Sequence, residues 1–388
     1  MTSTDWFQNA IVYHVLIDRF AGLTSTEPLC PEFLGGTLRA ITGKLPYLEE
    51  LGIDTLWLSP FCKTSAYHGY HVTDYFEVEP RFGTRDDLRR LIDGGHTAGI
   101  RIIADFVPNH CGRSHPFFQE AIRDRRSRYF SWFSFARWPD DYLCFLDVKE
   151  LPKLNLNCPE ARDHVVRAAK HWLSLGLDGF RLDHVIGPSH DFWKFFRREI
   201  KRDYPATVLI GEAWLEGIDR RHLKTLQIRN KYLRWIFGVS QEGIQREYCG
   251  ELDGVLDFRF RDLVRTHITH GTGEGPALVD ILRRRLATYP KGYFLPTFLD
   301  NHDMNRILYE CRNDRERLKA AARLQFSLDQ PAIIYYGTEA GMTHEYPVAV
   351  GRPHSDLQAR QPMHWNGQDK ELFAFYRELI RQKKERFD

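Results

Sequence analysis

The amino-acid sequence predicts an α/β fold, a (β/α)8 TIM barrel with a small inserted subdomain after its third strand. Three observations predict it. Short runs rich in Ile, Val, Leu and Phe alternate with longer amphipathic segments along the 388 residues. The alternation gives eight strand and helix units, the number in such a barrel. One connection, of about fifty residues, is far longer than the loops that join such units.

The first three units lie in the first third of the chain. The apolar runs IVYHVLI, IDTLWLSP and IRIIADFVPNH occupy residues 11–17, 53–60 and 100–110 and predict strands. Amphipathic segments at residues 36–52 and 85–99 follow the first two runs and predict helices.

The later units continue the same alternation to the end of the chain. We expect five more strands near residues 179–183, 207–212, 254–258, 293–299 and 332–336. We expect helices near residues 160–175, 190–202, 277–288, 316–329 and 370–383.

The long connection follows the third strand and contains the aromatic-rich stretch YFSWFSFARW. We interpret residues 108–158 as the inserted subdomain and residues 1–107 with 159–388 as the barrel. The sequence begins at the first strand and stops near the end of the eighth helix. We therefore expect neither an N-terminal module nor a C-terminal β-sandwich.

Composition limits the class of partner. Lysine plus arginine (54) and aspartate plus glutamate (52) nearly cancel, so no global field favours nucleic acid or anionic lipid. Seven cysteines without a CxxC pair are typical of reduced thiols in a cytoplasmic protein. No signal peptide or membrane-spanning run is evident. We expect a cytoplasmic protein with an uncharged partner, no nucleic-acid or membrane partner, and an oligomeric state that the sequence leaves unknown.

Polar residues gather at the predicted C-terminal ends of four strands, where the active sites of such barrels lie. Taken singly, one such cluster is as well explained by a structural ion pair, but four at one barrel mouth predict a functional site. The residues are Asp105, Asn109 and His110, then Arg181, Asp183 and His184, then Glu212, and finally Asp300, His302 and Asp303.

Three carboxylates in a neutral, aromatic-lined cleft suit glycosidic bond cleavage, which needs a nucleophile and an acid/base roughly 5 Å apart for retention of configuration. Arg181 precedes Asp183 by two residues, so both side chains lie on one face of the strand. The guanidinium would hold the carboxylate ionised. Glu212 is preceded by LIG and followed by Ala213 and Trp214, a less polar setting that suits the acid.

Specific motifs stand in a fixed order along the chain: YHGYHVTDY, DFVPNH, LPKLN, GFRLDH, GEAW and FLDNHD. With these motifs the sequence resembles the α-amylase family, glycoside hydrolase family 13, over nearly its whole length. The LPKLN segment also resembles the branch of neopullulanases, cyclomaltodextrinases and maltogenic amylases. The resemblance implies activity on α-glucans.

The resemblance also implies residue roles. Asp183 would be the nucleophile, Glu212 the general acid/base and Asp303 the carboxylate that binds and distorts the sugar. The implied substrate-binding residues are His68, Tyr70, His110, Arg181 and His302, with Tyr70 stacking under the sugar. Trp214 is a candidate wall beyond the cleaved bond. Asp105 is at least as well explained as a structural residue at the end of the third strand.

Two departures from the family pattern carry expectations. Many members bind calcium through an asparagine at the place of Asn109 and an aspartate in an LPDLN-like segment, where this chain has Lys153. An ammonium repels a hard cation, so we expect this metal site to be lost and no cofactor to be required. After the nucleophile, Ile186 and Gly187 replace the Lys-His pair that commonly contacts the leaving side.

The leading hypothesis is a retaining hydrolase that cleaves α-1,4-glucosidic bonds of maltooligosaccharides, cyclodextrins or starch by double displacement. A 4-α-glucanotransferase would use the same residues, with an acceptor sugar replacing water. A catalytically inactive, amylase-like binding protein is the third hypothesis. Loss of a carboxylate would indicate it, and all three carboxylates are present.

Overall fold

Eight parallel strands form one sheet at the centre of the protein. The computed structural model describes residues 4–25, 27, 29–230, 238–269, 271, 276–349 and 352–386. The strands are β1 (Ile11–Val15), β2 (Thr55–Leu58), β5 (Arg101–Phe106), β10 (Gly179–Leu182), β11 (Val208–Gly211), β12 (Gly254–Val255), β13 (Thr297–Phe298) and β14 (Ala332–Tyr335).

The sheet closes on itself. Its strands follow one another in chain order, and β1 pairs in parallel with β14. β13 lies on the other side of β14, and the segment that leads into β13 reaches back to β12. Gly254 of β12 forms a parallel bridge with Phe294 of this segment, and the Val255 amide donates to the Phe294 carbonyl at 3.1 Å. This bridge completes the ring. The predicted TIM barrel is therefore confirmed.

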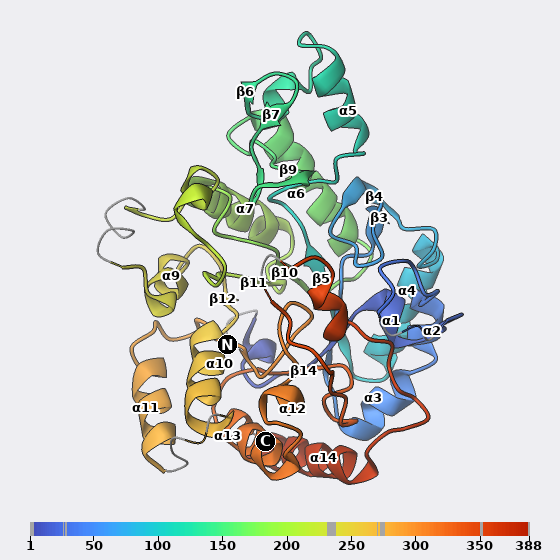
Figure 1. The fold of residues 1–388 in the computed structure, drawn as a ribbon, viewed down its shortest axis with the longest axis vertical. Coiled ribbons are helices and arrows are strands. Elements are labelled where there is room, and N and C mark those ends of the chain that lie inside the picture. The colour runs from blue at the N-terminus through green and yellow to red at the C-terminus, as the bar shows by residue number, and fades with distance from the viewer. Residues whose placement is uncertain are drawn as a thin grey trace.

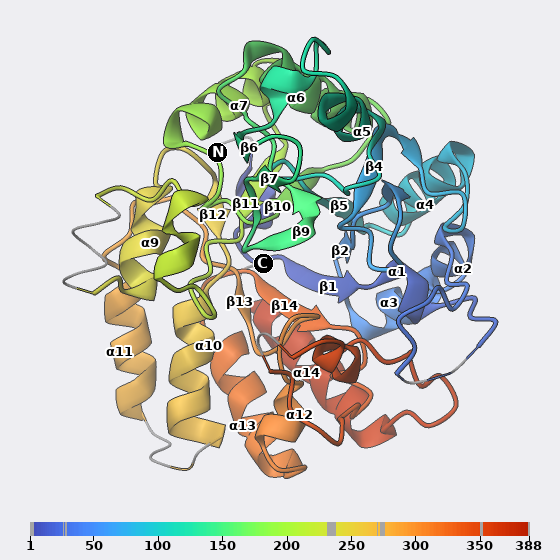
Figure 2. The ribbon, with the colours of Figure 1, turned by 45° about the horizontal axis from the view of Figure 1, so that its top comes forward.

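Helices surround the barrel in the order that the sequence predicts (Figures 1 and 2). The longer ones are α4 (Arg85–Thr97), α6 (Pro159–Leu173), α7 (His190–Asp203), α11 (Pro276–Leu286), α13 (Arg315–Phe326) and α14 (Lys370–Glu385). The shorter ones are α1 (Ile17–Phe20), α2 (Leu38–Thr42), α3 (Leu45–Leu51), α5 (Pro116–Arg123), α9 (Gln241–Glu247), α10 (Phe258–Val264) and α12 (Ile307–Glu310). Side-chain caps fix several starts, among them the Thr84–Asp87 capping box of α4 and Ser189 of α7.

The structure corrects three expected boundaries. The helix expected at residues 36–52 is two helices, since α3 starts afresh with Pro46 in its first turn, where a proline needs no amide partner. The strand expected near 254–258 ends at Val255, because Asp257 caps α10 by accepting from the Phe260 amide. The strand expected near 293–299 is only β13, because Pro296 has no amide to donate.

Alternation along the strands decides which side chains reach the site. On β10, Phe180 and Leu182 belong to the apolar layer between the strands and the helices. A strand has a period of two, so Arg181 points the other way, into the barrel. There it stands above an interior cluster that includes Trp57 and Ile103.

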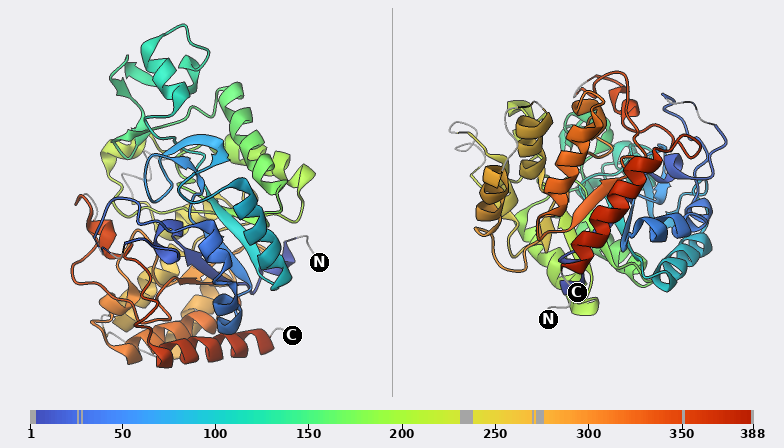
Figure 3. Two further views of the ribbon diagram at one scale, coloured as in Figure 1. Left: turned by 90° about the vertical axis from the view of Figure 1, so that its right-hand side faces the viewer. Right: turned by 90° about the horizontal axis from the view of Figure 1, so that it is seen from below.

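The connection between β5 and α6 projects from the barrel on the side of the molecule opposite to α14 (Figures 1 and 3). It contains α5, two antiparallel pairs, and a bridge from His110 to Lys153 at its base. The pairs are β6 (Phe135–Arg137) with β7 (Asp141–Tyr142), and β8 (Cys144–Phe145) with β9 (Val148–Pro152). The assignment of residues 108–158 to a separate subdomain stays our interpretation.

Another hairpin, β3 (Cys62–Thr64) with β4 (Val72–Val78), follows β2 and was not expected from the sequence. Its loop carries His68 and Tyr70 to the barrel mouth. Within the described part of the chain, no helix is long and apolar enough to cross a membrane.

Candidate active site

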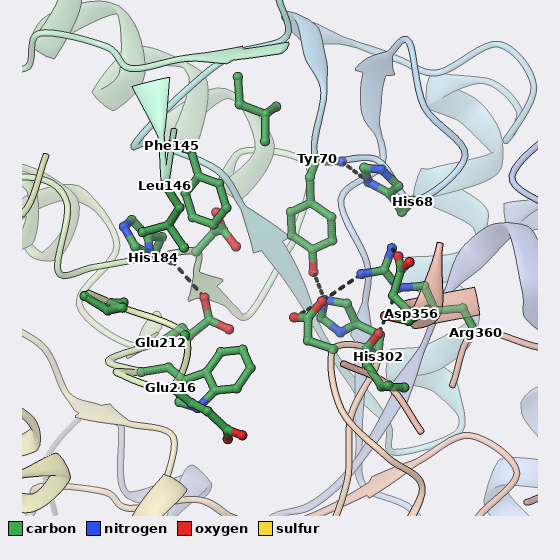
Figure 4. Close-up of a pocket in the computed structure, with 18 of the residues that line it drawn as sticks. His68, Tyr70, Phe145, Leu146, His184, Glu212, Glu216, His302, Asp356 and Arg360 are labelled. Carbon is green, nitrogen blue, oxygen red and sulfur yellow. Dashed lines mark hydrogen bonds and ion pairs between the residues drawn. The ribbon is translucent and has the colours of Figure 1, made fainter. Parts of the chain in front are cut away.

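A cleft of about 390 Å³ opens at the C-terminal ends of the barrel strands (Figure 4). Eight of the nine site residues predicted from the sequence line it: His68, Tyr70, His110, Asp183, Glu212, Trp214, His302 and Asp303. The ninth, Arg181, does not line the cleft. It lies beneath the carboxylates and is 1% exposed.

Arg181 binds three carboxylates at once. Its Nη1 donates to Oδ1 of Asp105 at 2.7 Å and to Oδ1 of Asp183 at 2.9 Å, and its Nη2 forms an ion pair with Glu212. The Glu212 carboxylate also accepts from the His184 amide at 3.1 Å. One guanidinium therefore holds Asp183 and Glu212 close together at the floor of the cleft.

The charge of this cluster is unbalanced. Burial raises the pKa of Asp183 and of Glu212, with Arg181 opposing the rise and neighbouring carboxylates adding to it. Because one guanidinium faces several carboxyl groups, the cluster retains a proton at a pH where an isolated pair would be fully ionised. Double displacement needs one carboxyl group ionised and the other protonated, and a pair that keeps one proton supplies both states.

Asp303 differs from these two carboxyl groups. Burial alone would raise its pKa, but the facing His302 and Arg360 outweigh burial and hold the pKa well below its usual range. Nε2 of His302 lies 3.0 Å from Oδ2 of Asp303, and Nη2 of Arg360 donates to Oδ1 at 2.7 Å. Asp303 is thus ionised throughout the neutral range.

Arg360 was missed by the sequence analysis. Its side chain is nearly buried, and its Nε also donates to the His302 carbonyl at 2.8 Å. It lies in the connection that follows β14, away from any strand end, so no pattern in the sequence marks it.

Tyr70 joins the two halves of the site. Its hydroxyl donates to Oδ2 of Asp105 at 2.8 Å and lies 2.7 Å from Nε2 of His302, and the two rings are stacked. The Tyr70 amide donates to Nδ1 of His68. Asp105 does not line the cleft but holds both Arg181 and Tyr70, which favours the structural interpretation of this residue.

Two further predicted residues complete the floor. Nε2 of His110 lies 4.0 Å from Oδ2 of Asp183, and burial lowers the pKa of His110 to about 3, so the ring is neutral. Trp214 stacks on Phe258 and also lines the cleft.

The cleft has two walls (Figure 4). One wall carries Phe145 and Leu146 from the β8–β9 hairpin together with His184, Glu212 and Glu216. The opposite wall carries His68, Tyr70, His302, Asp356 and Arg360. Neither the hairpin residues nor Asp356 was predicted from the sequence, because tertiary folding alone brings them here.

The residues around Asn109 and Lys153 do not fit a calcium ion. The Lys153 ammonium donates to the Gly187 carbonyl at 2.7 Å. The Asn109 carboxamide packs against Gly187, and no donor among the described residues reaches its buried Oδ1. Calcium requires six to eight oxygen ligands, and a fixed ammonium next to the available carbonyl repels it. In the described part of the chain, no three His, Cys, Asp or Glu residues are grouped to hold a metal.

Comparison with known proteins agrees with this geometry. The family described as "Alpha amylase, catalytic domain" matches residues 7–385. "Alpha-amylase 2" of Dictyoglomus thermophilum is 36% identical over 98% of this chain and 64% of its own length. "Neopullulanase 2" of Thermoactinomyces vulgaris is 30% identical over 98% of this chain and 63% of its own.

Among solved structures, one named "Cyclomaltodextrinase" superposes with a TM-score of 0.83 at 29% identity, over 98% of this chain and 64% of that one. The chain thus spans a little under two thirds of the length of these relatives. The resemblance to the family, and to its neopullulanase and cyclomaltodextrinase branch, is confirmed.

Proposed function

The chain belongs to the α-amylase family, and on that basis we propose that it is a retaining hydrolase of α-1,4-linked glucans. The observation that carries the proposal is the attachment of Asp183 and Glu212 to the same guanidinium. Carboxyl groups bound to one guanidinium lie close together, which suits the separation of about 5 Å that double displacement needs better than the wider spacing of an inverting mechanism.

In the first step, the Asp183 carboxylate attacks the anomeric carbon of the sugar. Glu212 gives its proton to the glycosidic oxygen, so the leaving sugar departs neutral. Arg181 pairs with both carboxyl groups and burial raises the pKa of both, so the pair keeps one proton, which in our proposal lies on Glu212 while Asp183 carries the negative charge. The product of this step is a glycosyl ester on Asp183.

In the second step, water enters where the leaving sugar was. The ionised Glu212 takes a proton from this water, the oxygen attacks the anomeric carbon, and Asp183 leaves as a carboxylate. Two inversions restore the α configuration, and Glu212 ends the cycle protonated.

We call the wall formed by His68, Tyr70, His302, Asp356 and Arg360 the donor wall, and it binds the sugar that the nucleophile attacks. Asp303 is ionised and held by His302 and Arg360, so it accepts hydrogen bonds from sugar hydroxyls while its negative charge stabilises an oxocarbenium-like transition state. The Tyr70 ring supplies an apolar face for stacking. His68 and neutral His110 add hydrogen-bonding groups at the edges.

The substrate class follows from the cleft and the relatives together. The lining is uncharged apart from the catalytic cluster and a few rim residues, which suits neutral oligosaccharides. Because relatives carry the names cyclomaltodextrinase and neopullulanase, we propose that this chain prefers short or cyclic α-glucans to long starch chains. We also propose that no calcium is bound near Asn109, because Lys153 supplies a positive charge there.

A time course of products from maltoheptaose, γ-cyclodextrin and soluble starch tests this function. Faster consumption of the short and cyclic substrates, with only smaller products, is the expected result. Early products longer than maltoheptaose would instead establish the 4-α-glucanotransferase, in which a sugar replaces water in the second step. No turnover of any substrate would favour an inactive binding protein.

A further inference from the structure

The tip of the β8–β9 hairpin has an unusual backbone. Phe145 pairs with Val148 across the two strands, so Leu146 and Asp147 form a two-residue turn. Both have positive φ, 41° for Leu146 and 63° for Asp147, which is the pattern of a type I′ turn. Such turns favour Asn-Gly or Asp-Gly, because residues other than glycine, asparagine and aspartate are strained in the left-handed region.

Leucine is disfavoured at the first position of this turn for two reasons, its backbone conformation and its apolar side chain. It is strained there, and turn residues are ordinarily polar and exposed. Leu146 is instead partly buried and lines the cleft. Strain of this kind persists where the surrounding structure enforces it, and it concentrates at functional sites.

The surrounding structure does hold the turn from two sides. Asp147 forms ion pairs with Nε2 of His222 at 3.6 Å and with Nζ of Lys224 at 3.2 Å, both in the connection that follows β11. On the cleft side, the Phe145 ring packs edge-on against His184, with ring centroids 4.6 Å apart. The inserted segment and the β11 connection thus meet above the cleft.

The turn lies on the leaving-group side of the scissile bond. Leu146 stands on the wall that carries Glu212, the proposed acid, and faces the donor wall of Tyr70 and His302 (Figure 4). Ile186 and Gly187, which follow the nucleophile in the chain, do not line the cleft.

We propose that Leu146 is a specificity-determining residue that contacts the apolar face of the leaving glucose, and that Asp147 is a positioning residue that holds the strained turn over it. The proposal rests on the proposed function and adds the element that recognises the leaving sugar. The turn, anchored through Asp147 to His222 and Lys224, places an apolar side chain in the cleft that the segment after Asp183 does not supply.

Two substrates separate this role from catalysis itself. When maltoheptaose is cleaved, the leaving group is a sugar that can contact Leu146. When α-maltosyl fluoride is cleaved, the leaving group is a fluoride ion, which has no sugar ring for Leu146 to contact. The test measures kcat/KM on both for the parent protein, Leu146→Asn and Asp147→Asn. The control is Lys149→Gln, on β9 and outside the cleft, where Lys149 pairs with Asp141.

For Leu146→Asn we expect the ratio of kcat/KM on maltoheptaose to that on the fluoride to fall at least fivefold. The melting temperature should be equal to or above that of the parent, because asparagine tolerates the left-handed region. In Asp147→Asn the new residue also tolerates the left-handed region, but the ion pairs with His222 and Lys224 are lost. The ratio should therefore also fall, by a smaller factor than for Leu146→Asn. Lys149→Gln should keep the parent ratio.

A ratio within twofold of the parent for Leu146→Asn would overturn the proposal. So would an equal loss on both substrates with a lower melting temperature, since the turn would then serve only folding. If the parent releases no fluoride from α-maltosyl fluoride, the proposed function itself fails, and the inference fails with it.

Discussion

Arg181 organises the site at the scale of single residues. The desolvation of a buried guanidinium is offset only by its pairing with Asp105, Asp183 and Glu212. Because these three bonds fix both proposed catalytic carboxyl groups, the spacing on which the chemistry depends is set by one side chain.

The first prediction concerns the proposed nucleophile. Asp183→Asn should lower kcat on maltoheptaose by about 10⁴-fold or more, because an amide cannot form the glycosyl ester. The melting temperature should be unchanged or higher, since the substitution removes a buried carboxylate whose charged form is disfavoured. Asp191→Asn, at a carboxylate that is 95% exposed on α7, is the matched control. Near-normal turnover by Asp183→Asn would refute the assignment.

The second prediction concerns Arg360 and pH. The low pKa of Asp303 keeps it ionised as the pH falls, and Arg360 is one of the cations that hold the pKa low. Arg360→Met should therefore raise the pKa of Asp303 and move the acid limb of the kcat/KM profile to higher pH. The loss of kcat/KM should be smaller at neutral pH than at acid pH. The measurement is a pH profile on maltoheptaose for both proteins. An acid limb at the same pH in the variant would show that Arg360 does not control Asp303.

At the scale of elements, the inserted segment is fixed to the barrel through Lys153. Its ammonium donates to the Gly187 carbonyl of the β10 connection, next to the nucleophile strand. A covalently attached cation cannot be removed by a chelator, in contrast to a bound metal. The β8–β9 hairpin, which carries Phe145 and Leu146, is positioned from this base.

The third prediction follows from that attachment. Treatment with a chelator should leave both activity and melting temperature unchanged. Lys153→Met removes the hydrogen bond and should lower the melting temperature by about 2–4 °C. Differential scanning fluorimetry and initial rates check both, with Lys194→Met, at an exposed lysine on α7, as control. A large loss of activity in the chelator would contradict the proposal that calcium is absent.

At the scale of the whole molecule, the sequence predicts the barrel well because each strand and helix has its own local pattern. The strand expected near 179–183 is β10, and the strand ends together with the β3–β4 loop bring eight of nine predicted residues to one cleft. What the sequence does not reveal depends on long connections. Arg360, Phe145 and Leu146 reach the site only through tertiary folding, and their local sequence resembles that of any loop.

Barrel architecture also explains why these residues converge. The strands are parallel and their C-terminal ends meet at one mouth, so side chains far apart in the chain share a single cleft. The connections after β5, β10 and β11 then build one wall, and those after β2, β13 and β14 build the other. The barrel supplies the catalytic floor, and the connections supply the recognition of the substrate.

The central claim is that Asp183 and Glu212 cleave α-glucans by double displacement. Proton NMR during the first minutes of maltoheptaose cleavage, before mutarotation, tests it most directly by showing the anomeric configuration of the new reducing ends. The account predicts that these ends are α. Ends formed first in the β configuration would show a single inversion and contradict the proposed roles of both carboxyl groups.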